Sequence, residues 1–405
     1  MSSSGTTPSG MNEPVIQRKS SGGRTALIAV IAVIIVVVLV LVVGYQAGWF
    51  SSKSSSTTSG CTIPSGTTLL GAGSTLVYPL MYQWETVYGG GTVVNYEAVG
   101  STSGINYITA KSVDFGATDA PLNPAQRAAA PGLLTIPESA GGVVPIYNLP
   151  GVPTLNFNGS VLAQIYMGTI TNWNNTALQQ LNVGVTLPNA TILPVHRSDG
   201  SGTSFIFTSF LSLDSAQWKS TYGKSTAFPT NISVGTGQAK NAGVAGYVQK
   251  NSDTIGYVDL NYALNGGIQT GKVENPSGKF ILASVNNTAS ALKDANPTLP
   301  AGGADWYNVS VLNAPGATDY PITSLTYVVV YQDLSAAFTG ASAYTQTKAT
   351  ALVDFLLWME SATGGQSWAA QLYYVPLPAS ILSSAVTSID SITFNGAAVP
   401  GCTPT

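Results

Sequence analysis

One segment decides where the rest of this 405-residue chain must fold: an unbroken apolar run from Ala26 to Val43, rich in Ile, Val and Leu. At ~1.5 Å rise per residue, a helix of this length covers roughly the ~30 Å hydrocarbon core of a membrane. We therefore expect a transmembrane helix over residues 25–44. The alternative is a cleaved secretory signal, although the apolar region of a signal is typically ~7–15 residues and this run is longer.

Basic residues set the direction in which this helix crosses. Three of them precede the run within residues 1–24, whereas only Lys53 follows it closely. The positive-inside rule then keeps residues 1–24 in the cytoplasm as a disordered tail and makes the remaining chain the extracellular ectodomain of a single-pass protein of the cell membrane. Residues 45–60 are rich in Ser and Thr with nothing to bury, so we expect a flexible stalk there.

Charge is scarce in this chain, since 44% of its residues are hydrophobic and only 8% are charged, about a third of the usual ~25%. Enough apolar material remains for a core, and Ser, Thr, Asn and Tyr must supply solubility together with glycans. We predict N-glycosylation at six acceptor sequons: Asn158, Asn174, Asn189, Asn231, Asn286 and Asn308. Few carboxylates also leave few groups to protonate in acid, so an acidic external medium suits the chain.

The chain has only two cysteines, Cys61 and Cys402, and both are expected outside the cytoplasm. An oxidising compartment favours a disulfide between them. On the chain-entropy model, closing so long a loop stabilises the fold by about 5 kcal/mol. Two cysteines and the single histidine, His196, are too few to hold a metal, and we expect no cofactor.

A loop of small residues, Val195 to Ser204, reads VHRSDGSGTS and opens a helix-like run. Its arginine, Arg197, has only one counterpart beyond the first fifty residues, Arg127. Backbone N–H groups at a helix start and a guanidinium fork both suit a phosphate or a carboxylate. The alternative is a plain turn followed by a helix cap.

Three other segments support the anion-binding interpretation: Gly71 to Leu76, Gly100 to Gly104, and Asp114 to Pro121. The first two repeat the same design, a small polar loop that leads into an apolar helical run. Several helix starts directed at one spot would bind an anion without much net positive charge.

Together these segments resemble the signature blocks of the phosphate-binding proteins that supply ABC-type phosphate importers. Six blocks occur in that family's order over about residues 66 to 390: GAGSTLVYPLMYQW, VNYEAVGSTSGINYITAKSVDFGATDAPL, VLAQIYMGTITNWNN, RSDGSGTSFIFTSFL, IGYVDLNYA and YPITSLTYVVVY. The N-terminal anchor with its stalk is unusual for bacterial members, so the chain resembles an archaeal-type, membrane-anchored one. Ser74 and Leu76 depart from the residues common in the family, without a threat to the site.

The ectodomain alternates strand-like and helix-like runs, which is an α/β pattern. The expected strands are Thr92–Tyr96, Val113–Gly116, Gly142–Tyr147, Thr191–Val195, Thr254–Asp259 and Leu325–Tyr331. The expected helices are Leu76–Val87, Val161–Tyr166, Ser204–Leu213, Gln238–Lys250 and Lys348–Met359.

The resemblance implies a two-lobed fold of the type II periplasmic-binding-protein kind, with the ligand in a cleft between the lobes. Lobe 1 would comprise residues 61–143 and 325–405, and lobe 2 residues 144–324. The chain would cross between lobes near Val143-Val144 and again near 321–324. Both cysteines would then belong to lobe 1.

The resemblance also assigns the ligand contacts, almost all of them hydrogen-bond donors. The implied phosphate-binding residues are Thr75, Leu76 and Ser101 with Asp119 in lobe 1, and Arg197, Ser201, Gly202 and Thr203 in lobe 2. Asp199 would support the site by holding the Arg197 fork in plane. The ring of His196 should pack behind the cleft, because side chains alternate along a strand.

Asp119 stands out among these residues because an ionised carboxylate only accepts hydrogen bonds and repels a bare anion. Its presence makes sense if the ligand carries a proton, as phosphate does at neutral pH and sulfate does not. Asp119 would then select phosphate over sulfate. The alternative is a turn residue before Pro121.

These features predict extracytoplasmic, high-affinity binding of inorganic phosphate and its delivery to the ABC permease of a phosphate importer. Catalysis is not indicated, because no nucleophile pattern accompanies the histidine and no P-loop lysine follows Gly202. A net acidic ectodomain without a basic patch argues against nucleic acid. The alternatives are a surface receptor or S-layer-like structural protein, or a binder of sulfate or tungstate on the same fold.

Overall fold

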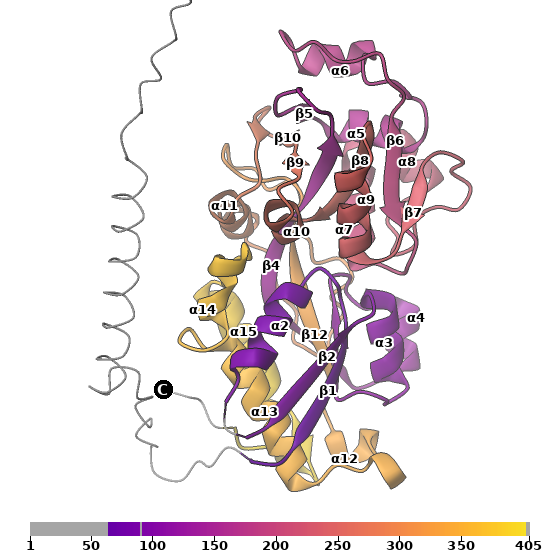
Figure 1. The fold of residues 1–405 in the computed structure, drawn as a ribbon. Helices are drawn as coiled ribbons and strands as arrows, with labels where there is room; N and C mark the ends of the chain where they lie inside the picture. The colour runs from indigo at the N-terminus through magenta and orange to yellow at the C-terminus, as the bar shows by residue number, and fades with distance from the viewer. Residues whose placement is uncertain (1–63, 90, 402–405) are drawn as a thin grey trace, which may run out of the picture. The chain divides into compact units, whose positions relative to one another are not determined.

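The computed structural model describes residues 64–89 and 91–401, which form a two-lobed α/β protein (Figure 1). A mixed sheet in the order β2-β1-β3-β12-β4-β8-β6-β7, with β9 paired to β4, runs through both lobes. Its strands are β1 (Thr68–Gly73), β2 (Val93–Ala98), β3 (Phe115–Thr118), β4 (Leu133–Asn148), β6 (Leu193–Arg197), β7 (Thr236–Gln238), β8 (Thr254–Asp259), β9 (Gln269–Thr270) and β12 (Thr323–Tyr331). Two small sheets contain β5 (Asn156–Phe157), β10 (Lys272–Glu274) and β11 (Phe280–Ile281), and β13 (Thr393–Phe394) and β14 (Ala397–Ala398).

Helices flank the sheet in both lobes (Figure 1). They are α2 (Tyr78–Val87), α3 (Ser101–Thr109), α4 (Pro124–Ala129), α5 (Gly159–Tyr166), α6 (Thr176–Leu181), α7 (Gly202–Asp214), α8 (Ala216–Thr221), α9 (Lys240–Lys250), α10 (Leu260–Asn265), α11 (Val285–Ala295), α12 (Leu334–Ala337), α13 (Gln346–Glu360), α14 (Gln366–Ala369) and α15 (Ala379–Asp390). Short 3₁₀ turns lie at η1 (Gly340–Ser342) and η2 (Ala370–Leu372).

Several expectations concern residues outside the described part of the chain. They are the cytoplasmic tail 1–24, the transmembrane helix 25–44, the stalk 45–60 and the disulfide between Cys61 and Cys402. Each of them stays a prediction. Among the residues that the structure does describe, none of the helices combines the length and apolar character that a membrane crossing needs.

Strand β4 is shared by the two lobes. Its first part pairs antiparallel with β12, from Leu133 opposite Tyr331 to Gly142 opposite Thr323. From Val143 onward its partner is β8 instead. Every residue of β4 except the last is buried, as expected for a strand covered on both faces. The lobe boundaries given above stay predictions, and β4 changes partner beside the crossover expected at Val143-Val144.

Most of the expected elements are present with ends shifted by one or two residues, but two predictions in lobe 1 were wrong. The segment from Gly71 was expected to be a loop, yet Gly71 to Gly73 end β1, whose backbone pairs in parallel with β2 and β3. A bare backbone is needed at Gly71, because a methyl group there would lie 2.1 Å from the Phe115 ring. Strand β4 also begins nine residues earlier than expected, at Leu133 rather than Gly142.

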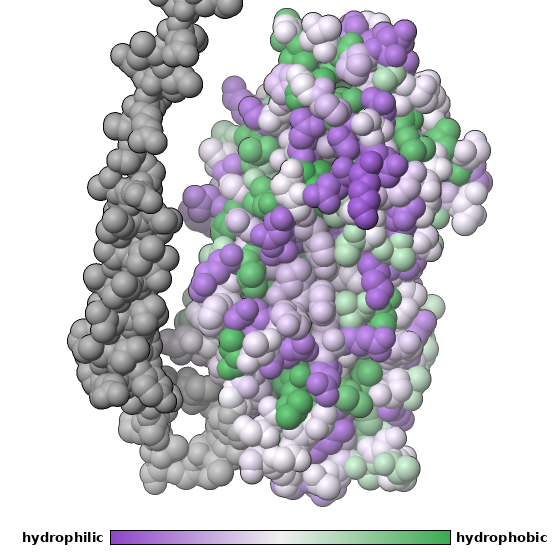
Figure 2. Space-filling model, viewed as in Figure 1, coloured by the Kyte–Doolittle hydropathy of each residue, from purple (hydrophilic) through white to green (hydrophobic). Residues whose placement is uncertain are grey.

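The surface is polar without being highly charged. On the face shown in Figure 2, hydrophilic and near-neutral residues dominate and hydrophobic residues are scattered among them. With only 8% of residues charged, Ser, Thr and Asn carry much of this polarity. The ionic groups are thus free to be concentrated where they bind or position something.

Two helical glycines give a matched test of the close approach between α3 and β1. A methyl group at Gly104 would lie 2.4 Å from Gly73 Cα and 2.6 Å from the Ala72 carbonyl oxygen. We expect Gly104→Ala to lower the free energy of unfolding by about 2 kcal/mol, because neither backbone can move aside. A methyl group at Gly246 in α9 would meet no atom within 4 Å. Gly246→Ala should therefore raise the free energy of unfolding by about 0.5 to 1 kcal/mol. Urea unfolding of both variants measures the difference, and equal effects would contradict this packing.

Candidate anion-binding site

The predicted site residues come from four separate segments that meet between the lobes. Thr75 follows β1, Ser101 begins α3 and Asp119 follows β3, whereas Arg197 ends β6 and the 201–203 segment begins α7. Gly202 lies so close to lobe 1 that a methyl group on it would be 2.5 Å from Asp119 Oδ2 and 2.6 Å from Ser101 Oγ. A side chain at position 202 would therefore hold the lobes apart.

Asp119 is 1% exposed, and its two oxygens have different surroundings. Oδ1 accepts hydrogen bonds from the hydroxyls of Ser74, at 2.6 Å, and Thr326, at 2.9 Å. Oδ2 has only a long contact of 3.4 Å from the Ser101 hydroxyl, and it faces Gly202 of the opposite lobe. The carboxylate is thus fixed through Oδ1 and presents Oδ2 to the cleft.

Burial raises the pKa of the Asp119 carboxyl, because a charge is costly away from water. The hydroxyls of Ser74 and Thr326 oppose this shift, and so does the positive charge of Arg197. These donors stabilise the ionised form, which can only accept hydrogen bonds. The site therefore holds one acceptor among many donors.

Arg197 is 2% exposed and forms a bidentate ion pair with Asp199. Its Nε donates to Oδ1 at 2.7 Å and its Nη2 donates to Oδ2 at 2.5 Å, while Nη1 lies 3.4 Å from Thr203 Oγ1. The expected pairing with Asp199 is thus present. Partial burial raises the pKa of Asp199, but the hydrogen bonds and charge of Arg197 outweigh burial and lower it overall.

Four backbone N–H groups at this point donate to no acceptor within the described part of the chain: those of Thr75, Ser101, Gly202 and Thr203. Ser101 begins α3, and Gly202 and Thr203 begin α7, where the first N–H groups of a helix have no partner in the helix itself. Thr75 lies in the turn between β1 and α2. The positive ends of both helix dipoles add to the charge of Arg197. This arrangement suits an anion with several oxygens.

Two of the expected donors are engaged within the protein. The Leu76 N–H donates to Ser74 Oγ at 3.0 Å. The Ser201 N–H donates to the Thr226 carbonyl at 2.8 Å, while Ser201 Oγ accepts from the Ser204 N–H and caps α7. The Ser201 hydroxyl keeps its own proton to donate. The ligand contacts of these two residues, like those of the other site residues, stay predictions.

Three residues to which the sequence analysis assigned no role also form the site. Ser74 gives Asp119 its shortest hydrogen bond, Thr326 gives it another, and Asn241 joins the lobes. The Asn241 side-chain N–H₂ group donates to Thr75 Oγ1 at 3.0 Å and to Thr203 Oγ1 at 3.1 Å. Ser74 stands inside the first signature block and Thr326 inside the sixth, so both could have been found there, but nothing local marks Asn241.

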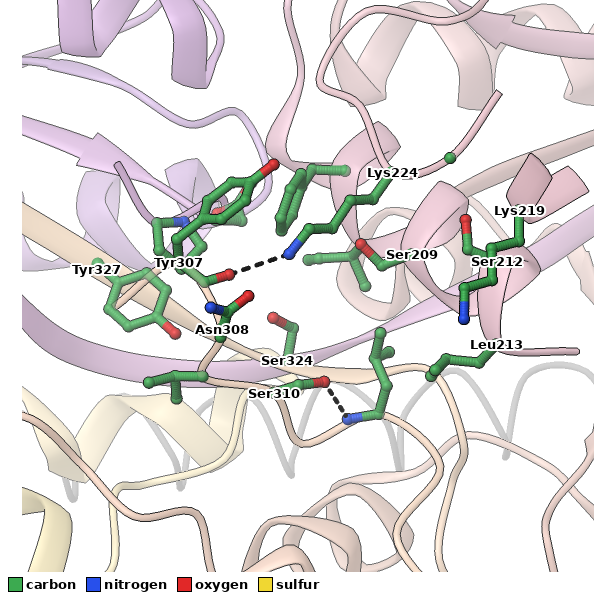
Figure 3. Close-up of a pocket in the computed structure, with 17 residues that line it drawn as sticks. Ser209, Ser212, Leu213, Lys219, Lys224, Tyr307, Asn308, Ser310, Ser324 and Tyr327 are labelled. Carbon is green, nitrogen blue, oxygen red and sulfur yellow. Dashed lines mark hydrogen bonds between the residues drawn. The ribbon is translucent and has the colours of Figure 1, made fainter. Parts of the chain in front are cut away.

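A pocket of about 370 Å³ lies beside the site, between α7 and the segment 305–312, and Asp119 forms part of its wall. Figure 3 shows Lys224 pointing toward Tyr307, with Lys219 at the opposite end. Lys224 Nζ donates to the Tyr307 carbonyl at 3.1 Å and sits 3.8 Å from the centre of its ring. Burial lowers the pKa of Lys224.

Of the predicted glycosylation sites, Asn308 lines this pocket, whereas the other five are not among its lining residues. Of the six predicted glycosylation sites, Asn189, Asn231, Asn286 and Asn308 are exposed, and Asn158 and Asn174 are partly buried. Asn158 caps α5 through its side chain and also donates to Glu274, so a glycan there would compete with both bonds. The ring of His196 stacks on Phe228, with ring centres 4.1 Å apart.

The sequence is similar to a known protein family and to named proteins of that family. Residues 54–361 match the PBP superfamily domain. The chain is 37% identical over 321 residues to the phosphate-binding protein PstS of Xylella fastidiosa, covering 77% of this chain and 82% of that one. It is 34% identical over 280 residues to the PstS of Methanocaldococcus jannaschii, covering 66% and 70%.

Solved structures share the architecture. A phosphate-binding protein from Stenotrophomonas maltophilia matches with a TM-score of 0.60 at 18% sequence identity, covering 80% of this chain and 94% of that one. At this identity the likeness supports the fold alone.

Buried acids in this part of the molecule predict a protein that is more stable in mild acid. Burial raises the pKa of Glu138 to about 8, from 4.5, and that of Asp259 to about 8, from 3.8. The folded state therefore keeps protons that the unfolded chain releases, so stability is highest below about pH 4 to 4.5 and falls as the pH rises toward 8. We expect the Tm of the ligand-free protein to drop by at least about 5 °C between pH 4.5 and pH 8.5.

Differential scanning calorimetry across this range tests that expectation. Asp259→Asn is the matched variant, since an amide oxygen can still accept from the Asn261 N–H, as Asp259 Oδ1 does at 2.9 Å, but cannot ionise. Its pH dependence should be shallower than that of the native protein. A Tm that rises with pH over this range would contradict the assignment of these groups as buried neutral acids.

Proposed function

The chain belongs to the phosphate-binding proteins of the PBP superfamily, and we propose that it captures inorganic phosphate outside the cytoplasm and delivers it to an ABC-type phosphate importer. It is a binding protein rather than an enzyme. The observation that carries the proposal is the single carboxylate, Asp119, among convergent donors. A fully deprotonated anion would be repelled by Asp119 Oδ2, whereas phosphate can donate its remaining proton to that oxygen.

The donors would divide the phosphate oxygens between the lobes. Lobe 1 would supply the N–H of Thr75, the N–H and hydroxyl of Ser101, and the N–H of Leu76 if it leaves Ser74 Oγ. Lobe 2 would supply Arg197, the hydroxyl of Ser201, and the N–H groups of Gly202 and Thr203. Arg197 supplies the full positive charge, and Asp199 fixes its plane. Because Asp199 accepts from Nε and from one N–H of Nη2, Nη1 and the second N–H of Nη2 would serve the ligand.

Closure of the lobes would complete this site. Hydrogen bonds already cross between the lobes, from Asn241 to Thr75 and from the Thr102 N–H to the Gly200 carbonyl at 3.3 Å. Ligand oxygens that bind both helix starts at once would favour the same closed arrangement. A closed receptor presents a defined surface to a permease, and opening there would release the phosphate.

We also propose where this exchange takes place. The predicted helix 25–44 would tether the ectodomain to the outer face of the cell membrane, and the stalk 45–60 would let it reach the permease. Tethering raises the effective concentration of receptor at the permease without any added contact. The predicted disulfide between Cys61 and Cys402 and glycans at the exposed sequons fit an extracellular location.

Calorimetry with the full-length protein in detergent, stripped of bound ligand, tests the function directly. Phosphate should bind tightly and sulfate should not. Tight binding of sulfate or tungstate would keep the fold and replace the substrate. If no oxyanion binds, the chain is a structural surface protein, and the proposal fails.

Removal of the arginine should weaken phosphate binding severely. We expect Arg197→Ala to cost about 2–5 kcal/mol, because it deletes the cation and leaves Asp199 unpaired beside the anion. Arg127→Ala is the matched control, since among the described residues the Arg127 guanidinium donates only to the carbonyls of Gly303 and Ala304. Calorimetry on both variants compares them, and a loss of equal size in the control would argue against a direct role for Arg197.

Selectivity should depend on the carboxylate. Asp119→Asn puts an N–H₂ donor where an acceptor stood, so we expect weaker phosphate binding and measurable sulfate binding. The ratio of the two dissociation constants is the quantity to measure. An unchanged ratio would mean that Asp119 does not select the ligand by accepting a hydrogen bond from its proton.

A further inference from the structure

Behind Asp119, one hydroxyl lies between two buried carboxyl groups. Thr326 Oγ1 is 2.9 Å from Asp119 Oδ1 and 3.0 Å from Glu138 Oε1. Glu138 is 0% exposed, and its other oxygen, Oε2, has no hydrogen-bond partner among the described residues. Nothing in the ligand contacts described above explains why a second acid is buried here.

The backbone places Glu138 at this point by a local irregularity. In the pairing of β4 with β12, Thr326 lies opposite Ser139 and Tyr327 lies opposite Pro137, so Glu138 is an extra residue in β4. Such a bulge changes the direction of a side chain. The Glu138 carbonyl, which the ladder cannot use, accepts from Gln366 Nε2 at 2.9 Å.

The number of protons available for these hydrogen bonds limits the protonation states of Asp119 and Glu138. A hydroxyl carries one proton, so Thr326 can donate to only one of its two carboxyl neighbours. If both acids were ionised, the second would face the hydroxyl oxygen and the other anion without a proton between them. One acid must therefore be neutral, and it must donate to Thr326.

The surroundings place that proton on Glu138 rather than on Asp119. Asp119 has Arg197 as a nearby cation and Ser74 as a second donor. Among the described residues, the ionisable groups coupled to Glu138 are all acids: the carboxyls of Asp119 and Glu360 and the phenol of Tyr96. No cation is found beside Glu138 in the described part of the chain.

We propose that Glu138 is a positioning residue of the phosphate site: as a neutral acid it donates to Thr326, which thereby turns its own proton to Asp119 Oδ1. Asp119 is then held ionised, with Oδ2 free to accept the proton of the ligand. This inference rests on the proposed function. It adds a residue that touches no ligand and yet sets the charge of the one that does.

The chemistry makes the arrangement sensitive to alkali. Burial raises the pKa of Glu138 to about 8. Above that pH Glu138 loses its proton and competes for the Thr326 hydroxyl, and two adjacent anions then face the phosphate. Affinity should fall as pH rises beyond the pKa, although the ligand keeps its own proton.

Glu138→Gln keeps a hydrogen-bond donor at this position and removes the ability to ionise, because the amide N–H₂ can donate to Thr326 and has no acidic proton to lose. Phosphate affinity of the full-length protein in detergent would be measured by calorimetry from pH 7 to pH 9.5. We expect the variant to bind within about threefold of the native protein at pH 7 and roughly tenfold more tightly at pH 9.5. Glu138→Leu, which has no donor, should be weaker at every pH.

Glu360→Gln is the matched control, because Glu360 is also a buried acid beside Glu138 but has no bond to Thr326. It should keep the native pH profile. If Glu138→Gln loses affinity in alkali as steeply as the native protein does, the proposal is wrong. Absence of phosphate binding by the native protein at pH 7 would instead overturn the proposed function.

Infrared difference spectroscopy gives a readout that needs no ligand. Subtracting the spectrum of Glu138→Gln from that of the native protein at pH 7 should leave the carbonyl stretch of a protonated acid, which disappears when the native sample is taken above pH 9. A carboxylate band in the difference spectrum at pH 7 would show Glu138 to be ionised and would overturn the assignment. Circular dichroism at each pH confirms that the variants are folded.

Discussion

The proposed site depends on the buried carboxylate of Asp119. Asp119 has lost its water, and hydroxyl donors on one of its oxygens, with Arg197 across the cleft, offset part of that loss. The hydrogen bonds to its Oδ1 join three strands of the sheet, because Ser74 directly follows β1, Asp119 directly follows β3 and Thr326 lies in β12. With Oδ1 held in this way, the second oxygen can remain available to a partner that brings a proton.

The low charge content of the chain is consistent with a site built mainly from neutral hydrogen-bond donors. With only 8% of residues charged, the proposed site would bind phosphate mainly with peptide N–H groups and hydroxyls, which are fixed in place by helix starts and by close packing. Glycines make that packing possible, since Gly202 touches the opposite lobe and Gly104 touches β1. Fixed dipoles need not reorganise when the ligand arrives, and salt screens them little when they are buried.

Local sequence patterns predicted the helix starts and the anion loop, because a small polar loop before an apolar helical run is a signal within ten residues. They did not predict β1, since Gly71 and its neighbours form a strand only through pairing with β2 and β3. Thr326 lies 207 residues from Asp119, so no spacing rule could join them. The bulge at Glu138 depends on register with β12, and register is a tertiary property.

Strand β12 both joins the sheet where the lobes meet and contributes a hydroxyl to the site, at positions only a few residues apart. It enters the sheet at Thr323, opposite the point where β4 changes partner, and three residues later it carries the hydroxyl that holds Asp119. A bend between the lobes at that point would twist the strand on which the acceptor depends. Mechanical opening of the cleft and loosening of the grip on phosphate would then be one event, so a permease that pulls the lobes apart would weaken affinity as it exposes the ligand.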